Sequence, residues 1–108
     1  MEKISFNEWQ KMDFRVAKVL DAEDHPNADK LMVLKIDLGN EQRIIVAGIK
    51  GHYNKEEMIG KKIVVFTNLE PAMLRGVKSE GMLLAAADKN KVILLSPEKD
   101  IVEGSKVS

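Results

Sequence analysis

The fold is decided by the stretch Leu31-Met32-Val33-Leu34-Lys35-Ile36-Asp37-Leu38, followed by Gly39-Asn40 and then by Arg43-Ile44-Ile45-Val46-Ala47-Gly48-Ile49. In the first run, every second residue is a large apolar one, which is the period of a strand with one buried face. Gly39-Asn40 is typical of a tight hairpin turn. The second run is rich in β-branched residues, which favour strands. The sequence therefore predicts an antiparallel hairpin over residues 31–49.

Other short apolar runs on both sides of this hairpin predict further strands. They cover residues 14–22, 62–68, 82–87 and 92–95, and residues 25–30 and 71–80 are expected to be loops. Turn signals recur about every 8–12 residues, which favours a small closed or nearly closed barrel over a parallel sheet. We expect a single, mainly all-β domain over residues 1–108.

Two short helices are expected. Ser5 followed by Glu8 has the spacing of a capping box and starts a helix from Phe6 to Met12. Asn54 and Glu57 have the same spacing before a helix that ends near residue 59. The first helix is too short to be stable alone, so its apolar residues must pack on the barrel or on a second chain.

The composition excludes several classes of protein. The 108 residues carry 17 Lys and Arg against 17 Asp and Glu, a net charge of zero, which argues against nucleic-acid binding through bulk electrostatics. There is no cysteine, and therefore no disulfide, thiolate metal site or Cys nucleophile. No apolar run approaches the roughly 18 residues of a membrane helix, so no membrane partner is expected.

Motifs of catalysis are missing. The sequence has no nucleotide-binding glycine loop and no nucleophile elbow, so we expect no enzyme activity and no cofactor. His25 lies beside Glu23 and Asp24, but without cysteine we interpret these residues as a solvated acidic turn and expect no metal site. His52 is expected in a surface loop.

Four ordered blocks resemble the tRNA-binding domain family. His25-Pro26-Asn27-Ala28-Asp29-Lys30-Leu31 resembles its HP-x-AD-x-L signature. The other blocks are Arg15-Val16 with Val19, Ile45-Val46-Ala47-Gly48-Ile49, and Asn68-Leu69 to Pro71 continuing into Gly76-Val77-Lys78-Ser79-Glu80-Gly81-Met82-Leu83-Leu84-Ala85. The family includes the C-terminal domain or β subunit of methionyl-tRNA synthetase, stand-alone tRNA-binding proteins and a secretion chaperone.

The resemblance implies a five-stranded oligonucleotide/oligosaccharide-binding (OB) barrel with terminal extensions that form a homodimer. The short helix at residues 4–12 would lie at the dimer interface, through Ile4, Phe6 and Trp9. The resemblance implies a non-catalytic, cytoplasmic module that binds tRNA. Such a module is either stand-alone or the C-terminal domain or β subunit of methionyl-tRNA synthetase, in which case the catalytic subunit is its partner. The expected RNA contacts are Lys30, Asn68, Arg75, Lys78, Ser79 and Met82, with Arg43 as a weaker addition.

The chain departs from the family pattern in its longest loop. Glu70, Ala72 and Met73 stand where many members carry basic residues, and Ala47 stands where many have Ser. Lys78 replaces an acidic residue of many members. Two alternatives therefore stay open. One is a peptide-binding secretion chaperone with an apolar groove at Met73 and Leu74, and the other is a module that only dimerises a synthetase.

Overall fold

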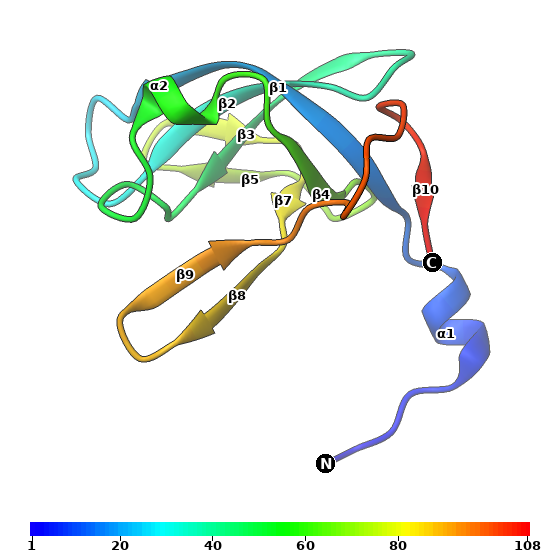
Figure 1. Cartoon of the computed structure of the whole chain (residues 1–108). Coiled ribbons are helices and arrows are strands. Elements are labelled where there is room, and N and C mark those ends of the chain that lie inside the picture. The colour runs from blue at the N-terminus through cyan, green and yellow to red at the C-terminus, as the bar shows by residue number, and fades with distance from the viewer.

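Five antiparallel strands curl into a nearly closed barrel, as the computed structural model of all 108 residues shows (Figure 1). Their order is β3-β2-β1-β4-β7. They are β1 (Phe14–Asp24), β2 (Met32–Asp37), β3 (Gln42–Ala47), β4 (Lys62–Phe66) and β7 (Met82–Leu83). The predicted all-β class and the 31–49 hairpin are confirmed, and the OB-like barrel agrees with the resemblance.

Strand β1 holds the two sides of the barrel together. Its first half pairs with β4, from Phe14 to Lys18, and its second half pairs with β2, from Lys18 to Asp24. The register shifts between Val19 and Asp21. Such an irregularity bends a strand and increases its twist. Strand β1 can therefore pair with β4 on one side of the barrel and with β2 on the other.

The core lies inside the barrel and follows the alternation of the sequence. In β2 the residues at every second position are fully buried. Partly buried side chains of Tyr53, Val92 and Leu94 pack against this core. Fourteen buried residues form it: Ala17, Val19, Ala22, Met32, Leu34, Ile36, Leu38, Ile45, Ala47, Ile49, Met58, Ile63, Val65 and Leu83.

The stretch 71–80 is a hairpin and not the predicted loop. Strands β5 (Ala72–Leu74) and β6 (Val77–Ser79) pair antiparallel across Arg75 and Gly76. Both turn residues have positive φ, 53° and 90°. A two-residue turn of this kind matches the twist of its strands, and Asn or Asp usually fills its first position. Arginine at that position gave no turn signal.

A side-chain hydroxyl helps to close the barrel between β3 and β6. The buried Ser79 Oγ accepts a hydrogen bond from the Val46 N–H and donates one to the Gly81 carbonyl, both at 2.9 Å. The Glu80 N–H donates to the Ile44 carbonyl at 2.9 Å. Gly81 has a φ of +140°, and a Cβ there would lie 3.0 Å from the Phe66 carbonyl oxygen. Closure therefore depends on a serine and a glycine two residues apart.

The two helices are short. Helix α1 (Phe6–Gln10) starts at Ser5, whose side chain accepts from the Glu8 N–H, and it ends two residues before the predicted Met12. Helix α2 (Lys55–Met58) has a complete capping box between Asn54 and Glu57. Neither helix is long and apolar enough to cross a membrane.

Two C-terminal elements complete the fold. Strands β8 (Ala85–Asp88) and β9 (Lys91–Leu94) form a hairpin that projects from the barrel to the lower left in Figure 1, whereas α1 lies at the lower right. Strand β10 (Lys106–Val107) pairs with the start of β1. The tail before β10 passes close to the β2–β3 turn at Leu38 and Gly39, and the Gly104 N–H donates to the Val16 carbonyl of β1 at 2.7 Å.

His25 joins the 25–31 loop to the β5–β6 hairpin. It is 4% exposed. Its Nδ1 accepts the Asn27 N–H at 3.0 Å, so its Nε2 carries the proton and donates to the Leu74 carbonyl at 2.9 Å. The expectation of a solvated turn is wrong for this residue, because the loop folds back and buries the ring. The fold thereby fixes two loops that are distant in sequence against each other.

Replacing Gly104 by alanine should destabilise the protein by about 1–3 kcal/mol in chemical denaturation. Its φ is +92°, and a Cβ would lie 2.4 Å from the Leu38 carbonyl oxygen. Gly51→Ala is the matched control, because Gly51 has a φ of +100° with nothing within 4 Å of its Cβ position. The control should lose clearly less stability, and equal losses would show that the tail does not press on the β2–β3 turn.

His25→Asn should loosen the hairpin while the loop stays closed. An asparagine oxygen can still accept the Asn27 N–H, but the side chain is too short to reach Leu74. We expect a loss of about 1 kcal/mol, and about 1–3 kcal/mol for His25→Ala, which loses both bonds. Hydrogen exchange should accelerate selectively in residues 72–79 of His25→Asn. Unchanged exchange there would contradict the assigned link.

Candidate nucleic-acid interface

Three of the residues predicted to contact RNA are exposed to solvent and form no ion pair. Lys30 lies in the 25–31 loop, Arg75 forms the tip of the β5–β6 hairpin, and Lys78 lies on β6. None of the three pairs with a carboxylate in the structure. The His25–Leu74 hydrogen bond fixes the start of the loop to the last residue of β5, next to Arg75. The fold therefore brings these three cations onto two connected loops, which we call the loop face.

The loop face also contains an apolar side chain that the sequence prediction did not place among the RNA contacts. Met73 is directly opposite Lys78 in the hairpin register, so the two side chains share a face. Met73 is 65% exposed. A flexible thioether beside an ammonium group suits a base or ribose next to a phosphate. Reading 72–79 as a hairpin would have identified this pair.

Two predicted contacts are used inside the protein instead. Both hydrogen-bonding functions of the Ser79 hydroxyl serve barrel closure. The Asn68 amide bridges the link between α1 and β1, because Oδ1 accepts the Asp13 N–H at 2.8 Å and Nδ2 donates to the Lys11 carbonyl at 2.6 Å. We therefore assign structural roles to Ser79 and Asn68 and leave them out of the loop face.

Arg43 is also occupied. Its Nη1 donates to the Thr67 and Glu80 carbonyls at 2.6 and 3.3 Å, and its Nε donates to Glu41 at 2.6 Å. This hydrogen bond and the positive charge of Arg43 lower the pKa of Glu41 below its ordinary value. Arg43 thus connects the start of β3 to the chain after β4. Its side-chain hydrogen bonds stand there in place of backbone hydrogen bonds between strands.

Met82 lies in an aromatic row away from the hairpin tip. The strand register places Phe14, Phe66 and Met82 side by side across β1, β4 and β7. Trp9 of α1 packs on Phe14 with ring centroids 5.5 Å apart, and Phe14 packs on Phe66 at 5.0 Å. Met82 is half-buried in this row. Its surroundings associate it with the helix and not with RNA.

A polar network fixes α1 to the barrel below that row. The Arg15 guanidinium donates to both oxygens of Asp13, the Thr67 hydroxyl donates to the same carboxylate, and the Thr67 N–H donates to the Asp13 carbonyl. The hydrogen bonds from Arg15 and then from Thr67 hold the pKa of Asp13 below its ordinary value despite partial burial. The helix is therefore anchored through its C-terminal end.

The outer surface of α1 remains uncovered. Ile4, Phe6 and Trp9 are 62%, 68% and 39% exposed, and no residue of the helix is buried. A groove of about 470 Å³ runs between α1 and β10, lined by these two aromatic residues with Met12 and Val107. An apolar surface of this kind on a short helix indicates an interaction site.

The structure brings together no group of three or more His, Cys, Asp or Glu side chains that could hold a metal ion. The two His25 ring nitrogens already have protein partners.

Comparison with known proteins identifies a tRNA-binding family model and methionine–tRNA ligases as relatives of this chain. A family model described as a putative tRNA binding domain matches residues 14–106. The methionine–tRNA ligase of Pyrococcus furiosus is 52% identical over 107 residues, which is 99% of this chain and 15% of that protein. The ligase of Nanoarchaeum equitans is 54% identical over 104 residues, 96% of this chain and 13% of that protein. The chain thus spans a small part of these relatives.

Solved structures agree over the whole chain. A MetRS-related protein from Pyrococcus horikoshii superposes with a TM-score of 0.93 at 37% identity and covers 100% of both chains. The chaperone CsaA of Bacillus anthracis has a TM-score of 0.90 at 31% identity and covers 99% of this chain and 100% of its own. From the family model and the relatives together, the chain belongs to the tRNA-binding domain family.

Proposed function

We propose that this chain is a non-catalytic module that binds tRNA through the loop face and assists a methionyl-tRNA synthetase in the cytoplasm. The observation that carries the proposal is the His25–Leu74 hydrogen bond, because it holds two loops with free cations in one arrangement. The family membership and the identity to methionine–tRNA ligases support the choice of tRNA as the partner.

The proposed binding is modest and depends on shape. Only Lys30, Arg75 and Lys78 are available on the loop face, and the chain as a whole is neutral. Three cations support a few phosphate contacts and no more, so the affinity is low and falls with salt only as steeply as these few contacts allow. Lysine and arginine contacts to phosphates position an RNA without reading its sequence. The module would therefore increase tRNA capture, while tRNA choice stays with the synthetase.

We propose in addition that the chain works as a homodimer through α1. Ile4, Phe6 and Trp9 form an exposed apolar surface beside a groove, and α1 lies outside the barrel at its lower right in Figure 1. A second copy would cover this surface. Two loop faces in one dimer raise the effective concentration of each for a single tRNA.

A peptide-binding chaperone is the second candidate. The observation that favours it is the TM-score of 0.90 to the chaperones CsaA of Bacillus anthracis and Picrophilus torridus, together with the exposure of Met73. Binding of an unfolded peptide that tRNA does not displace would support this candidate against the first.

Arg75→Gln and Lys78→Gln should each weaken tRNA binding roughly 3- to 10-fold at low salt. Each should also reduce the slope of log affinity against log salt by about 1, because one phosphate contact is lost. Fluorescence anisotropy with labelled tRNA measures both quantities. Lys55→Gln, an exposed lysine on α2, is the control and should bind as the unchanged chain does. Full affinity in both test variants would exclude the loop face.

Phe6→Ser should convert a dimer to a monomer without unfolding the barrel. Phe6 is 68% exposed, so its loss removes interface area and little internal packing. Light scattering should change from twice the mass of one chain to a single mass, while the melting temperature of the barrel stays within a few degrees. Ile59→Ser, at a residue 53% exposed near α2, is the control. A monomeric unchanged chain would contradict the dimer proposal.

A further inference from the structure

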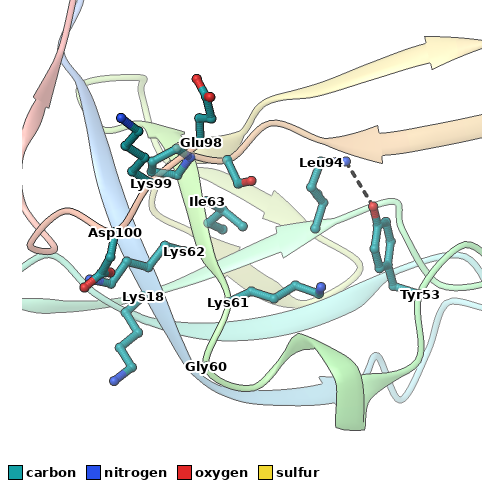
Figure 2. A pocket seen from close by; sticks show the side chains of 12 residues that line it. Lys18, Tyr53, Gly60, Lys61, Lys62, Ile63, Leu94, Glu98, Lys99 and Asp100 are labelled. Carbon is teal, nitrogen blue, oxygen red and sulfur yellow. Dashed lines mark hydrogen bonds and ion pairs between the residues drawn. The ribbon is translucent and has the colours of Figure 1, made fainter.

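A second basic surface lies away from the loop face, in a cleft of about 620 Å³ (Figure 2). Its walls come from β1, from the start of β4 and from the tail after β9. Four lysines line it, Lys18, Lys61, Lys62 and Lys99, against the two carboxylates of Glu98 and Asp100. This excess of positive charge is local, because the whole chain is neutral.

One of the four lysines is structural. Lys62 Nζ lies 2.7 Å from Asp100 and 3.5 Å from Glu103, and it donates to the Ile101 carbonyl at 2.5 Å. Its hydrogen bond to Asp100 raises the pKa of Lys62 and lowers that of Asp100. Lys62 therefore fixes the tail to β4 and offsets one of the three carboxylate charges nearby, those of Glu98, Asp100 and Glu103.

The other three lysines lie outside ion-pair distance of any carboxylate, and the charge of Lys18 acts on the nearby Asp100 and Glu103. Lys18, Lys61 and Lys99 form no ion pair. Lys61 Nζ lies 5.7 Å from the centre of the Tyr53 ring, and the ring is held by its hydroxyl, which accepts the Leu94 N–H at 3.1 Å. In Figure 2, Lys61 extends toward Tyr53, and Lys18 and Lys99 lie on opposite sides of the Lys62–Asp100 pair. Lys61 is thus held in place by an aromatic ring that leaves its charge unneutralised.

The cleft is separate from the loop face. The loop face starts beyond Asp24, at the end of β1, whereas Lys18 lies six residues earlier on that strand. At about 3.3 Å per residue, this part of β1 is at most roughly 20 Å long. None of the residues that line the cleft belongs to the loop face.

We infer that this cleft is a second contact for the phosphate backbone of the same RNA, made by Lys18, Lys61 and Lys99. The inference rests on the proposed tRNA function and extends it. Lysine ammonium groups act as point charges toward phosphates. A folded RNA that spans roughly 20 Å meets both surfaces, and the second surface compensates for the few cations of the first. Recognition then depends on the distance between the two contacts and therefore on RNA shape.

The test compares the double variant Lys61→Gln/Lys99→Gln with the unchanged chain on two RNAs. For full-length tRNA, we expect about a tenfold loss of affinity and a salt slope reduced by about 2. For a stem-loop shorter than roughly 20 Å, we expect unchanged affinity, since it reaches only one surface. The control is Lys89→Gln/Lys91→Gln at the tip of the β8–β9 hairpin. Melting temperatures should be the same in all chains.

The outcomes separate this inference from the proposal on which it rests. If the unchanged chain binds no tRNA, both fail. If it binds tRNA and Lys61→Gln/Lys99→Gln binds with the same affinity and salt slope, the second surface is excluded and the loop face remains. Equal losses on the short stem-loop and on tRNA would also overturn the inference, because they show a single shared surface.

Discussion

The closure of the barrel at Ser79 is the constraint on which the rest depends. A full ladder between β3 and β6 is replaced by the Ser79 hydroxyl, which connects the Val46 N–H to the Gly81 carbonyl, and by the Glu80–Ile44 bond. A buried backbone N–H without a partner costs about 1–3 kcal/mol, so the hydroxyl is required there. Since Ser79 is the last residue of β6, closure also fixes the hairpin that carries Arg75 and Lys78.

The polar side chains divide into two groups with different tasks. Ser79, Asn68, Arg43 and His25 form hydrogen bonds to the protein backbone and thereby hold loops and strand ends, and Arg43 also donates to the Glu41 side chain. The cations of the loop face, and Lys18, Lys61 and Lys99 of the cleft, form no ion pair. A protein with zero net charge can thus present positive surfaces, because several of its carboxylates pair with other cations, as Asp13 does with Arg15 and Asp100 with Lys62.

The sequence predicts most of the fold and only part of the site. Alternation in residues 31–38, the Gly39-Asn40 turn and the cap at Asn54 are local signals, and the structure agrees with each. The β5–β6 hairpin was not predicted, because Arg75 has a left-handed backbone conformation at a turn position that asparagine or aspartate usually fills. The internal roles of Ser79, Asn68 and His25 depend on partners 33 to 57 positions away, which no local pattern reveals. Of the proposed RNA contacts, Lys30, Arg75 and Lys78 were predicted from residue type and are exposed in the structure.

Amide chemical-shift mapping of the isotope-labelled chain during a tRNA titration tests the central claim most directly. The account predicts that the largest shifts fall in residues 25–31 and 72–79, with a second group around Lys18, Lys61 and Lys99. The outer surface of α1 should stay unchanged. Shifts confined to α1 and the β8–β9 hairpin, or no shifts at low salt, would contradict the proposal that the loop face binds tRNA.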